Sequence, residues 1–217
     1  MHISILGPPG VGKGTYSNSL SKMLGIPHLS PGEIFKQEIS RNTDLGREVK
    51  TYVEKGLLVP DEIVVKVVEK AVKTLGKNGF IIDGYPRTLY QAEYSEKVFP
   101  VDIAVFLNAP DIVILERISG RLRCPVCGKT YHVEWNPPKK KWVCDVCGAK
   151  LVRRSDDEID IVKKRLEVYR KNIYPILRFY DKRGKLLEFD ASIDSRLGIP
   201  ILAEKIMSII NVREIKL

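Results

Sequence analysis

The sequence predicts an α/β fold in which a parallel sheet is covered by helices on both faces. Apolar runs of strand length alternate along the chain with segments whose apolar residues recur every three or four positions. A glycine-rich loop joins the first apolar run to the first of these helical segments. All four cysteines lie in two close pairs, which predicts a small inserted subdomain. Strands that alternate with helices pair in parallel, because each helix returns the chain to the same end of the sheet.

The expected strands are short apolar runs bounded by glycine, proline or charged residues. They cover residues 2–6, 79–84, 101–107 and 185–189. The expected helices are longer and cover residues 15–25, 61–76, 110–120, 156–184 and 200–210. The helix at 156–184 begins with acidic residues, which favour a helix N-terminus, and contains Pro175, where we expect a kink.

Composition excludes several classes of protein. The chain has 217 residues, of which 44% are hydrophobic, enough for one buried core with an inserted subdomain and too many for a disordered protein. No run approaches the ~18 apolar residues of a membrane span. Residues 1–15 lack the charged and apolar regions of a secretion signal. We therefore expect a cytoplasmic protein with no membrane partner.

The net charge of +9 is concentrated in one part of the chain. Residues 117–154 contain ten Lys or Arg against two acidic residues, Glu134 and Asp145, whereas the remainder is close to neutral. A basic region of this kind implies a polyanionic partner. A nucleic acid and a nucleotide triphosphate both qualify.

The cysteine pairs have the spacing of a structural zinc site. They follow the pattern C-x2-C, sixteen residues, C-x2-C, and each pair is followed by a glycine. The four ligands are Cys124, Cys127, Cys144 and Cys147. Two disulfides are the alternative, which a reducing cytosol disfavours. Four thiolates complete a tetrahedral shell, so the metal should be structural and hold no catalytic water.

The stretch "GPPGVGKGT", residues 7–15, is typical of a phosphate-binding loop. It lies between the first strand and the first helix, so its backbone N–H groups and the positive end of the helix point at one spot. Lys13 should reach the β and γ phosphates. The usual pattern has Ser or Thr directly after this lysine, whereas here Gly14 intervenes and the hydroxyl comes at Thr15.

A carboxylate is expected beside this loop. In "GFIIDGYPRT", residues 79–88, Asp83 ends an apolar strand, and ligands bind at the carboxyl ends of strands in open α/β sheets. Asp83 could simply cap the next loop. Because a phosphate loop is present in the same chain, we favour a site in which Asp83 and Thr15 hold Mg²⁺ through water.

Taken together these motifs resemble adenylate kinases, specifically the long form with a zinc-binding lid. The resemblance runs from Met1 to the last helix and rests on "GPPGVGKGT", "DGYPRT", "ERISGR", "RRSDD" and "VKKRL", which occur in this order. It implies a P-loop NTPase-type core of residues 1–29, 60–120 and 155–217, an NMP-binding segment at 30–59 and a zinc-binding lid at 121–154. It also implies the reversible, Mg²⁺-dependent reaction ATP + AMP = 2 ADP.

The resemblance further implies a set of site residues. The catalytic residues are Lys13, Arg87, Arg121, Arg154 and Arg165. The ATP-binding residues are Gly10, Gly12, Lys13, Gly14, Thr15, Arg117 and Arg121. The AMP-binding residues are Pro31, Lys36, Leu57, Val59, Gly84, Arg87, Gln91, Arg154 and Arg165.

The resemblance also implies a role for most of these residues. Arg121, Arg154 and Arg165 would close on the transferring phosphoryl group, and Arg117 would lie against the ATP base. Arg87 would hold the acceptor phosphate. Gln91 would read the edge of the acceptor adenine, beside a base pocket lined by backbone at Leu57 and Val59. Arginine suits phosphoryl transfer, because its planar fork pairs with phosphate oxygens and keeps its charge when water is excluded.

The chain departs from the family pattern in "SPGEIFK", residues 30–36. Most adenylate kinases have Thr, Asp and Arg where this chain has Pro31, Glu33 and Lys36. Pro31 has neither a hydroxyl nor an N–H group, and Lys36 offers a point charge instead of a fork. Ala191 stands where glycine is common near the ATP base. We therefore expect acceptor binding that is weaker or less selective for adenine than is usual in the family.

Two rival functions follow from the same residues. One is a different nucleoside monophosphate kinase, acting on UMP, CMP or several acceptors. The other is a nucleic-acid-binding ATPase, because zinc ribbons bind nucleic acid and aromatic residues alternate with lysines in this region. We expect these aromatics, Tyr131, Trp135 and Trp142, to form the core of the lid instead.

Other basic residues of the region should be solvated surface charges. They are Arg123, Arg153 and residues 139–141.

Overall fold

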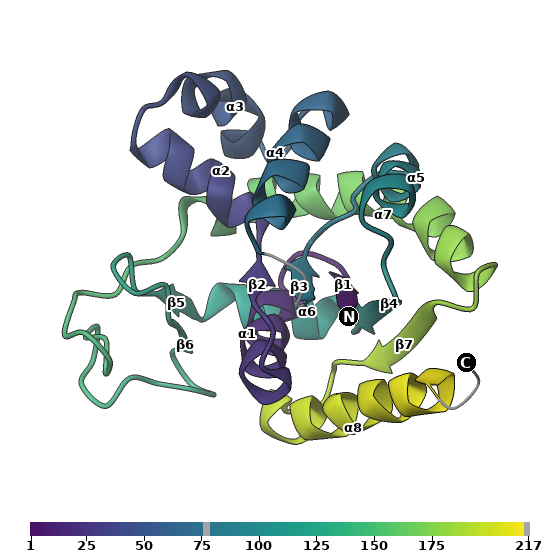
Figure 1. The fold of residues 1–217 in the computed structure, drawn as a ribbon. Coiled ribbons are helices and arrows are strands. Elements are labelled where there is room, and N and C mark those ends of the chain that lie inside the picture. Colours follow the sequence, from purple (N-terminus) through teal and green to yellow (C-terminus); the bar gives the residue numbers. More distant parts are fainter. Residues whose placement is uncertain (76–78, 215–217) are drawn as a thin grey trace.

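The computed structural model describes residues 1–75 and 79–214, apart from the side chains of Ser155 and residues 211–214. Its centre is a five-stranded sheet in which all neighbouring strands are parallel, in the order β2-β3-β1-β4-β7 (Figure 1). The strands are β1 (His2–Leu6), β2 (His28–Leu29), β3 (Phe80–Asp83), β4 (Ile103–Asn108) and β7 (Leu186–Asp190). The predicted α/β class with a parallel sheet is confirmed.

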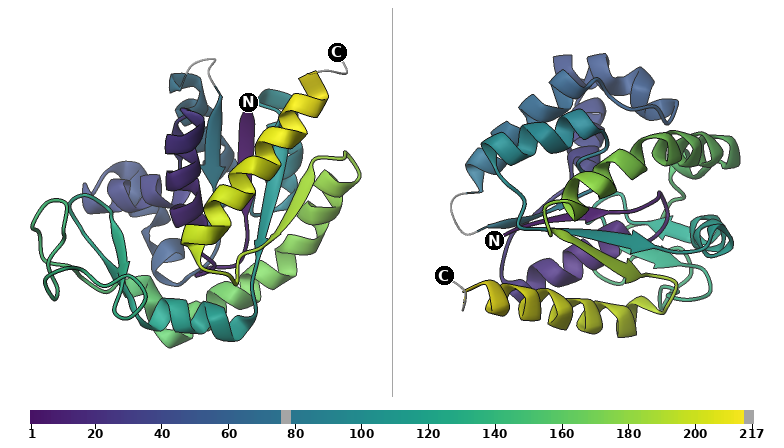
Figure 2. Two further views of the ribbon diagram at one scale, coloured as in Figure 1. Left: turned by 90° about the horizontal axis from the view of Figure 1, so that it is seen from below. Right: turned by 90° about the vertical axis from the view of Figure 1, so that its right-hand side faces the viewer.

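Helices cover both faces of this sheet. They are α1 (Lys13–Leu24), α4 (Asp61–Thr74), α5 (Leu89–Val98), α6 (Asp111–Ser119), α7 (Ile159–Asp181) and α8 (Ser195–Glu214). Helices α1 and α8 lie on one face, and α4, α5 and α7 lie on the other (Figure 2). Strand β1 serves both layers because successive side chains point to opposite faces. Ile3 and Ile5 enter the core under α1 and α8, whereas Leu6 packs with Ile176 and Tyr180 of α7.

Two predicted helices begin elsewhere than expected. Helix α7 starts at Ile159, because residues Ser155–Asp157 form a separate 3-10 turn, η1, whose carboxylates pair with arginines. Helix α8 starts at Ser195, five residues before the predicted Pro200, because Asp194 caps it by accepting from the backbone N–H of Arg196 at 2.8 Å. Residue 76, the expected end of α4, lies outside the described residues.

A helical segment projects from one edge of the core, at the upper left of Figure 1. It consists of α2 (Pro31–Ser40) and α3 (Asp44–Glu54), which pack on each other. Pro31 occupies the first helical position of α2, where a missing N–H group costs nothing. The two helices cross closely at Gly46, where an added Cβ would lie 2.1 Å from the carbonyl oxygen of Glu38.

The cysteine-rich region forms a small lobe at the lower left of Figure 1. It is built on β5 (Arg121–Arg123) paired antiparallel with β6 (Thr130–His132). Its core consists of Leu122, Cys124, Tyr131, Cys144 and Leu151. Trp142 packs against this core, as expected, but Trp135 does not: it is 48% exposed and stacks on His132.

None of the described helices combines the length and the apolar character that crossing a lipid bilayer requires.

Candidate active site

The loop between β1 and α1 has the geometry of a phosphate site. Gly7, Gly10 and Gly12 have positive φ of 147°, 87° and 107°, values that residues other than glycine rarely adopt. A Cβ on Gly10 would also lie 2.5 Å from Cδ1 of Ile118. In the first turn of α1 the N–H groups of Thr15 and Tyr16 donate to the carbonyl oxygen of Gly12 at 2.9 and 3.1 Å. The N–H groups of Lys13 and Gly14 precede any helical acceptor, so they are available to an anion at the positive helix end. The loop therefore suits a chain of phosphates.

Lys13 folds back over this loop. Its Nζ donates to the carbonyl oxygens of Gly7 at 2.8 Å and Pro8 at 2.9 Å. Burial lowers the pKa of Lys13 to about 7, although Asp83 opposes the shift. A bound polyphosphate would favour the charged ammonium, so Lys13 is suited to take up a proton as phosphate binds.

Asp83 lies at the carboxyl end of β3, beside the first turn of α1. Its Oδ2 would be 3.4 Å from a Cβ placed on Gly14, so the carboxylate lies close to the residue between Lys13 and Thr15. A carboxylate near a hydroxyl and phosphates is the oxygen set that Mg²⁺ prefers, with water completing its shell. Asp83 therefore fits magnesium, and Thr15, the other expected ligand, is exposed in the first turn of α1.

His28 lies on the other side of Asp83. Its Nε2 is 3.7 Å from Asp83 Oδ2, and its Nδ1 is 3.0 Å from Oδ1 of Asn18 on α1. Among the described residues this buried Nε2 has no hydrogen-bond partner. No sequence motif identifies His28, because a lone histidine on a short strand carries none.

Three of the predicted arginines lie together at η1. They come from β5, from the residue before η1 and from α7. Arg121 on β5 donates from Nε to Asp157 Oδ2 at 2.8 Å, and from Nη2 to the other carboxylate oxygen. Arg154 places Nε and Nη2 at 2.8 and 2.7 Å from the two carboxylate oxygens of Asp156. Arg165 on α7 places Nη1 at 2.8 Å from Asp156 Oδ2. The fold thus assembles these arginines around two adjacent carboxylates.

Asp156 is the centre of this cluster. Lys36 of α2 also reaches it, with Nζ 3.2 Å from Oδ2. Burial alone would raise the pKa of Asp156, but the hydrogen bonds and charge of Arg154, with Lys36 and Arg165, hold it well below its usual range. Burial lowers the pKa of Lys36 to about 8 and that of Arg165 to about 10, while Asp156 raises both.

The cationic side chains converge on the phosphate loop. A Cβ on Gly84 would lie 3.2 Å from Nη2 of Arg87 and 3.6 Å from Cε of Lys13, so these two cations meet beside the loop. After the larger effect of burial, the positive charges of Arg87, Arg165 and Arg121 also lower the pKa of Lys13. Such an arrangement is unfavourable by itself and becomes favourable when an anion of high charge binds among them. The site is therefore suited to binding a polyanion.

Arg87 follows β3 and is anchored on its own turn. Its Nε donates to the carbonyl oxygen of Gly84 at 2.7 Å, and its backbone N–H donates to Oε1 of Gln91 at 2.7 Å. Gln91 is 1% exposed, and its Nε2 donates to Asp61 at 2.7 Å. Both polar atoms of Gln91 therefore position Arg87 and α4. Recognition of an acceptor base by Gln91 stays a prediction. It would use the second N–H group of the Gln91 amide.

The remaining predicted nucleotide contacts lie at two places. Leu57 and Val59 lie in the connection between α3 and α4, where Leu57 is exposed and Val59 is buried. Arg117 on α6 donates to the carbonyl oxygens of Val11, Ser192 and Ile193 at 2.8, 3.3 and 3.2 Å. Arg117 thus bridges the phosphate loop and the loop after β7, where the ATP base is expected.

The four cysteines form one cluster. Their Sγ atoms all lie within 4.8 Å of one another. Cys124 and Cys147 Sγ are 3.3 Å apart and Cys127 and Cys144 Sγ 3.5 Å, whereas a disulfide bond measures ~2.05 Å. Both pairs turn in the same way, since the N–H groups of Gly128 and Gly148 donate to the carbonyls of Cys124 and Cys144.

Donors around two of the four sulfurs, those of Cys124 and Cys144, favour thiolates. The backbone N–H of Cys127 lies 3.4 Å from Cys124 Sγ, and the Tyr131 hydroxyl lies 3.5 Å from Cys144 Sγ. The hydrogen bond from Tyr131 lowers the pKa of Cys144 to about 6. This set of donors fits a tetrahedral zinc ion, which binds thiolates at ~2.3 Å.

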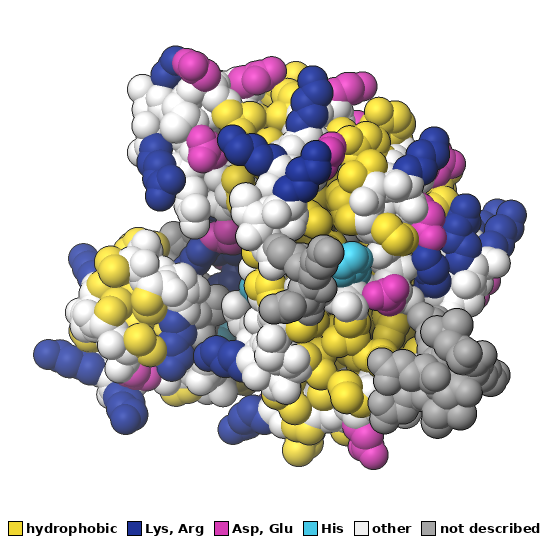
Figure 3. All heavy atoms as spheres, in the orientation of Figure 1, with side chains coloured by type: hydrophobic (Ala, Val, Ile, Leu, Met, Phe, Trp, Pro, Cys, Tyr) yellow, Lys and Arg dark blue, Asp and Glu magenta, His cyan; other side chains and the backbone are white. Residues whose placement is uncertain are grey.

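One basic residue was assigned wrongly from the sequence. Arg123 was expected to be a solvated surface charge, but its guanidinium pairs with both carboxylate oxygens of Glu33 on α2. Arg153 and residues 139–141 are exposed, as expected. In the space-filling view, basic and acidic side chains meet in the notch between the lid lobe and the lobe of α2 and α3 (Figure 3).

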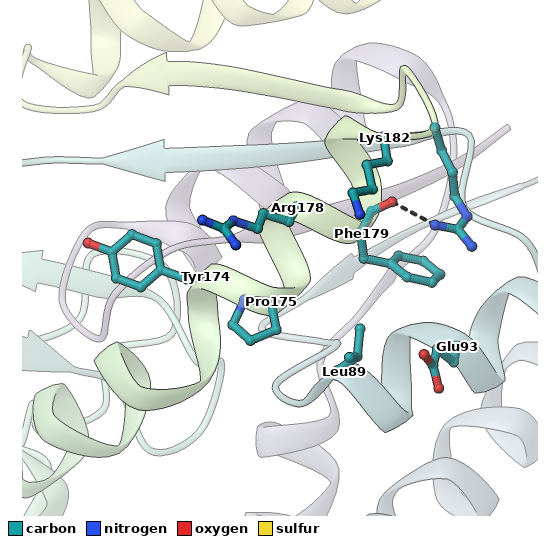
Figure 4. A pocket seen from close by; sticks show the side chains of 8 residues that line it. Leu89, Glu93, Tyr174, Pro175, Arg178, Phe179 and Lys182 are labelled. Carbon is teal, nitrogen blue, oxygen red and sulfur yellow. Dashed lines mark hydrogen bonds between the residues drawn. The ribbon is translucent and has the colours of Figure 1, made fainter.

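A separate hollow of about 560 Å³ lies between α5 and the second half of α7 (Figure 4). It is lined by Leu89, Glu93, Tyr174, Pro175, Arg178, Phe179, Lys182 and Arg183. Its lining includes none of the predicted site residues. Most of these side chains are exposed, and Arg183 is held on the ring of Phe179.

The phosphate loop, the carboxylate beside it and the converging arginines define a phosphotransferase with a P-loop core. A sequence profile described as adenylate kinase matches residues 5–185. The chain is 46% identical to the adenylate kinase of Caldicellulosiruptor saccharolyticus over 193 residues, 86% of this chain and 90% of the relative. It is 43% identical to that of Clostridium beijerinckii over 198 residues, 88% of this chain and 92% of the relative. The chain belongs to the adenylate kinase family.

Proposed function

We propose that this chain catalyses the reversible, Mg²⁺-dependent reaction ATP + AMP = 2 ADP. The observation that carries the proposal is the geometry of the site: Lys13 and Arg87 lie together beside the phosphate loop, both within 4 Å of the Cβ position of Gly84. Arg121, Arg154 and Arg165 gather at η1. Phosphoryl transfer requires positioning and charge neutralisation more than a covalent or acid-base group. Cations beside the phosphate loop and at η1 supply both.

Each part of the site has a proposed task. The loop from Gly10 to Thr15, with Lys13, holds the donor phosphates, and Arg117 lies against the donor base. Arg87, preset by its bonds to Gly84 and Gln91, holds the acceptor phosphate. The arginines at η1 neutralise the group in transit; they are Arg121, Arg154 and Arg165.

Two metal ions belong to the proposal. Mg²⁺, held through water by Asp83 and Thr15, would neutralise phosphate charge when bound. Zinc on Cys124, Cys127, Cys144 and Cys147 would stabilise a lobe whose own hydrophobic core is small.

The proposed domains follow from these tasks. Residues 1–29, 60–120 and 155–217 form the core, 30–59 the NMP-binding segment and 121–154 the lid. An opening and closing lid would admit nucleotides and then exclude water, which otherwise competes for the phosphoryl group.

We propose that acceptor selectivity is relaxed. Pro31 begins α2 and offers no hydroxyl or N–H group to a nucleotide, and Lys36 reaches Asp156 with a single ammonium. A site with fewer hydrogen-bonding groups rejects analogues less strongly. Replacing both residues by the usual ones, as Pro31→Thr with Lys36→Arg, should raise the preference for AMP over other monophosphates.

The test is ADP formation from Mg-ATP with AMP, CMP, UMP or GMP, each with and without RNA. We expect turnover that depends on AMP, unaffected by RNA, with measurable rates for a second acceptor. If all other acceptors stayed about three orders of magnitude below AMP, relaxed selectivity would be wrong. A better acceptor than AMP would indicate another monophosphate kinase. ATP loss without an acceptor, rising with RNA, would indicate a nucleic-acid-binding ATPase.

A further inference from the structure

The strand that leads into the zinc site presents two arginines on one face. Side chains of β5 alternate, so Arg121 and Arg123 point one way and Leu122 points the other, into the lid core. Arg121 reaches Asp157 next to the transfer site. Arg123 reaches Glu33, and the residue after it is the zinc ligand Cys124.

The contact between Arg123 and Glu33 has the geometry of a specific pair. Arg123 Nη1 lies 2.8 Å from Glu33 Oε1, and Nη2 donates to Oε2. The side chains are only 24% and 34% exposed, and 90 residues separate them in sequence. Two parallel N–H···O bonds orient as well as attract, which a single ammonium does not do.

Glu33 lies between the lid and the proposed acceptor contact. It is in the first turn of α2, three residues before Lys36, and Lys36 Nζ is 4.0 Å from Glu33 Oε1. Asp156 holds the same ammonium from the other side at 3.2 Å. Burial would raise the pKa of Glu33, but Arg123, with help from Lys36 and Arg154, lowers it, so the carboxylate stays charged.

We propose that Arg123 is a positioning residue for the acceptor nucleotide: through Glu33 it ties the cysteine-rich lid to the first turn of α2 and sets the position of Lys36. This inference rests on the proposed function. It gives the metal-binding lobe a second task, since ligation of Cys124 restrains the backbone beside Arg123. The lobe then acts on acceptor binding as well as covering the donor.

The experiment compares steady-state kinetics of the zinc-loaded protein with those of Arg123→Gln, Glu33→Gln and the double variant. Arg153→Gln is the matched control, because it removes the same charge from the lid at an exposed residue. We expect Arg123→Gln to raise KM for AMP about five- to tenfold, as for loss of a part-buried charged hydrogen-bonded pair. KM for ATP should change by less than about twofold, because Arg123 contacts the acceptor segment and not the phosphate loop.

The KM for AMP of the double variant shows whether Arg123 and Glu33 act as a linked pair or independently. If the residues act through each other, Arg123→Gln with Glu33→Gln should raise KM for AMP no further than the worse single variant. Arg123→Lys, which keeps the charge and loses the fork, should give an intermediate KM. Additive single effects, an unchanged KM for AMP, or equal changes in both KM values with loss of zinc would each overturn the proposal.

Failure of the proposed function would look different. Wild-type protein without AMP-dependent ADP formation would refute the function itself. Wild-type protein with that activity, and variants with an unchanged KM for AMP, would refute only the role of Arg123.

Discussion

Replacing Asp156 by asparagine should lower stability more than any other single change of a charged group in the site. The Asp156 carboxylate bonds to Arg154 at 2.7 and 2.8 Å, to Arg165 at 2.8 Å and to Lys36 at 3.2 Å. Asp156→Asn keeps the shape of the side chain and removes the charge. Three cations would then repel one another without the carboxylate that they share.

The size of the effect follows from burial. The Asp156 side chain is 13% exposed, and those of Arg154, Arg165 and Lys36 are 20%, 22% and 29% exposed. Breaking a fully buried pair costs about 3–5 kcal/mol, so partial solvation reduces the expected loss to about 2–3 kcal/mol. For a chain of this length that corresponds to a fall in Tm of roughly 4–10 °C.

The assay is thermal unfolding at pH 7 and at several lower pH values, with Glu188→Gln as control. Glu188 is an exposed carboxylate of β7, and its loss should leave Tm within about 1 °C. Because the pKa of Asp156 lies below the ordinary 3.8, its stabilisation is present above that pH and lost as the pH falls below it. The Tm difference between wild type and Asp156→Asn should therefore shrink in acid. An unchanged Tm at pH 7 would refute the assignment of Asp156 as the centre of the cluster.

Three further predictions concern the metal, the lysine and the loop. Removing zinc with a chelator, or replacing a ligand by Cys144→Ser, should melt the lid before the core, seen as loss of tryptophan signal at lower temperature; unchanged melting after verified zinc loss would contradict this. Because the pKa of Lys13 is lowered to about 7, ATP affinity should weaken as pH rises above about 7, and calorimetry in two buffers should show proton uptake on binding near that pH; Lys13→Arg, which stays charged, should show none. Gly10→Ala should reduce kcat/KM for ATP more than about 100-fold, because its φ of 87° and a Cβ 2.5 Å from Ile118 both oppose a side chain. Gly25→Ala, with φ of 66° and no atom near its Cβ, should only cost about 1 kcal/mol of stability, and equal kinetic losses in both variants would show that the loop position is not special.

Features set by neighbours in the chain could be predicted from the sequence. The phosphate loop, the two cysteine pairs and most elements of the sheet depend on spacings of a few residues, which local geometry converts directly into structure. The predicted start of α8 was wrong because a proline signal competed with a helix cap. Pro200 was expected to begin the helix, but Asp194 caps it and the helix begins at Ser195. The two-residue strand β2 is too short to show any period.

The sequence by itself determined the chemical groups of the site: a phosphate loop, a carboxylate, arginines and four thiols. Each lies in a motif that indicates its ligand. Only the tertiary structure decided which of these groups meet. Arg123 pairs with Glu33, 90 residues away in sequence, and Lys36 pairs with Asp156, 120 residues away. These pairs form because the lid and the helices α2 and α3 project toward each other from one core. Charge pairing over such separations depends on the packing of whole segments, so no local pattern in either segment specifies it.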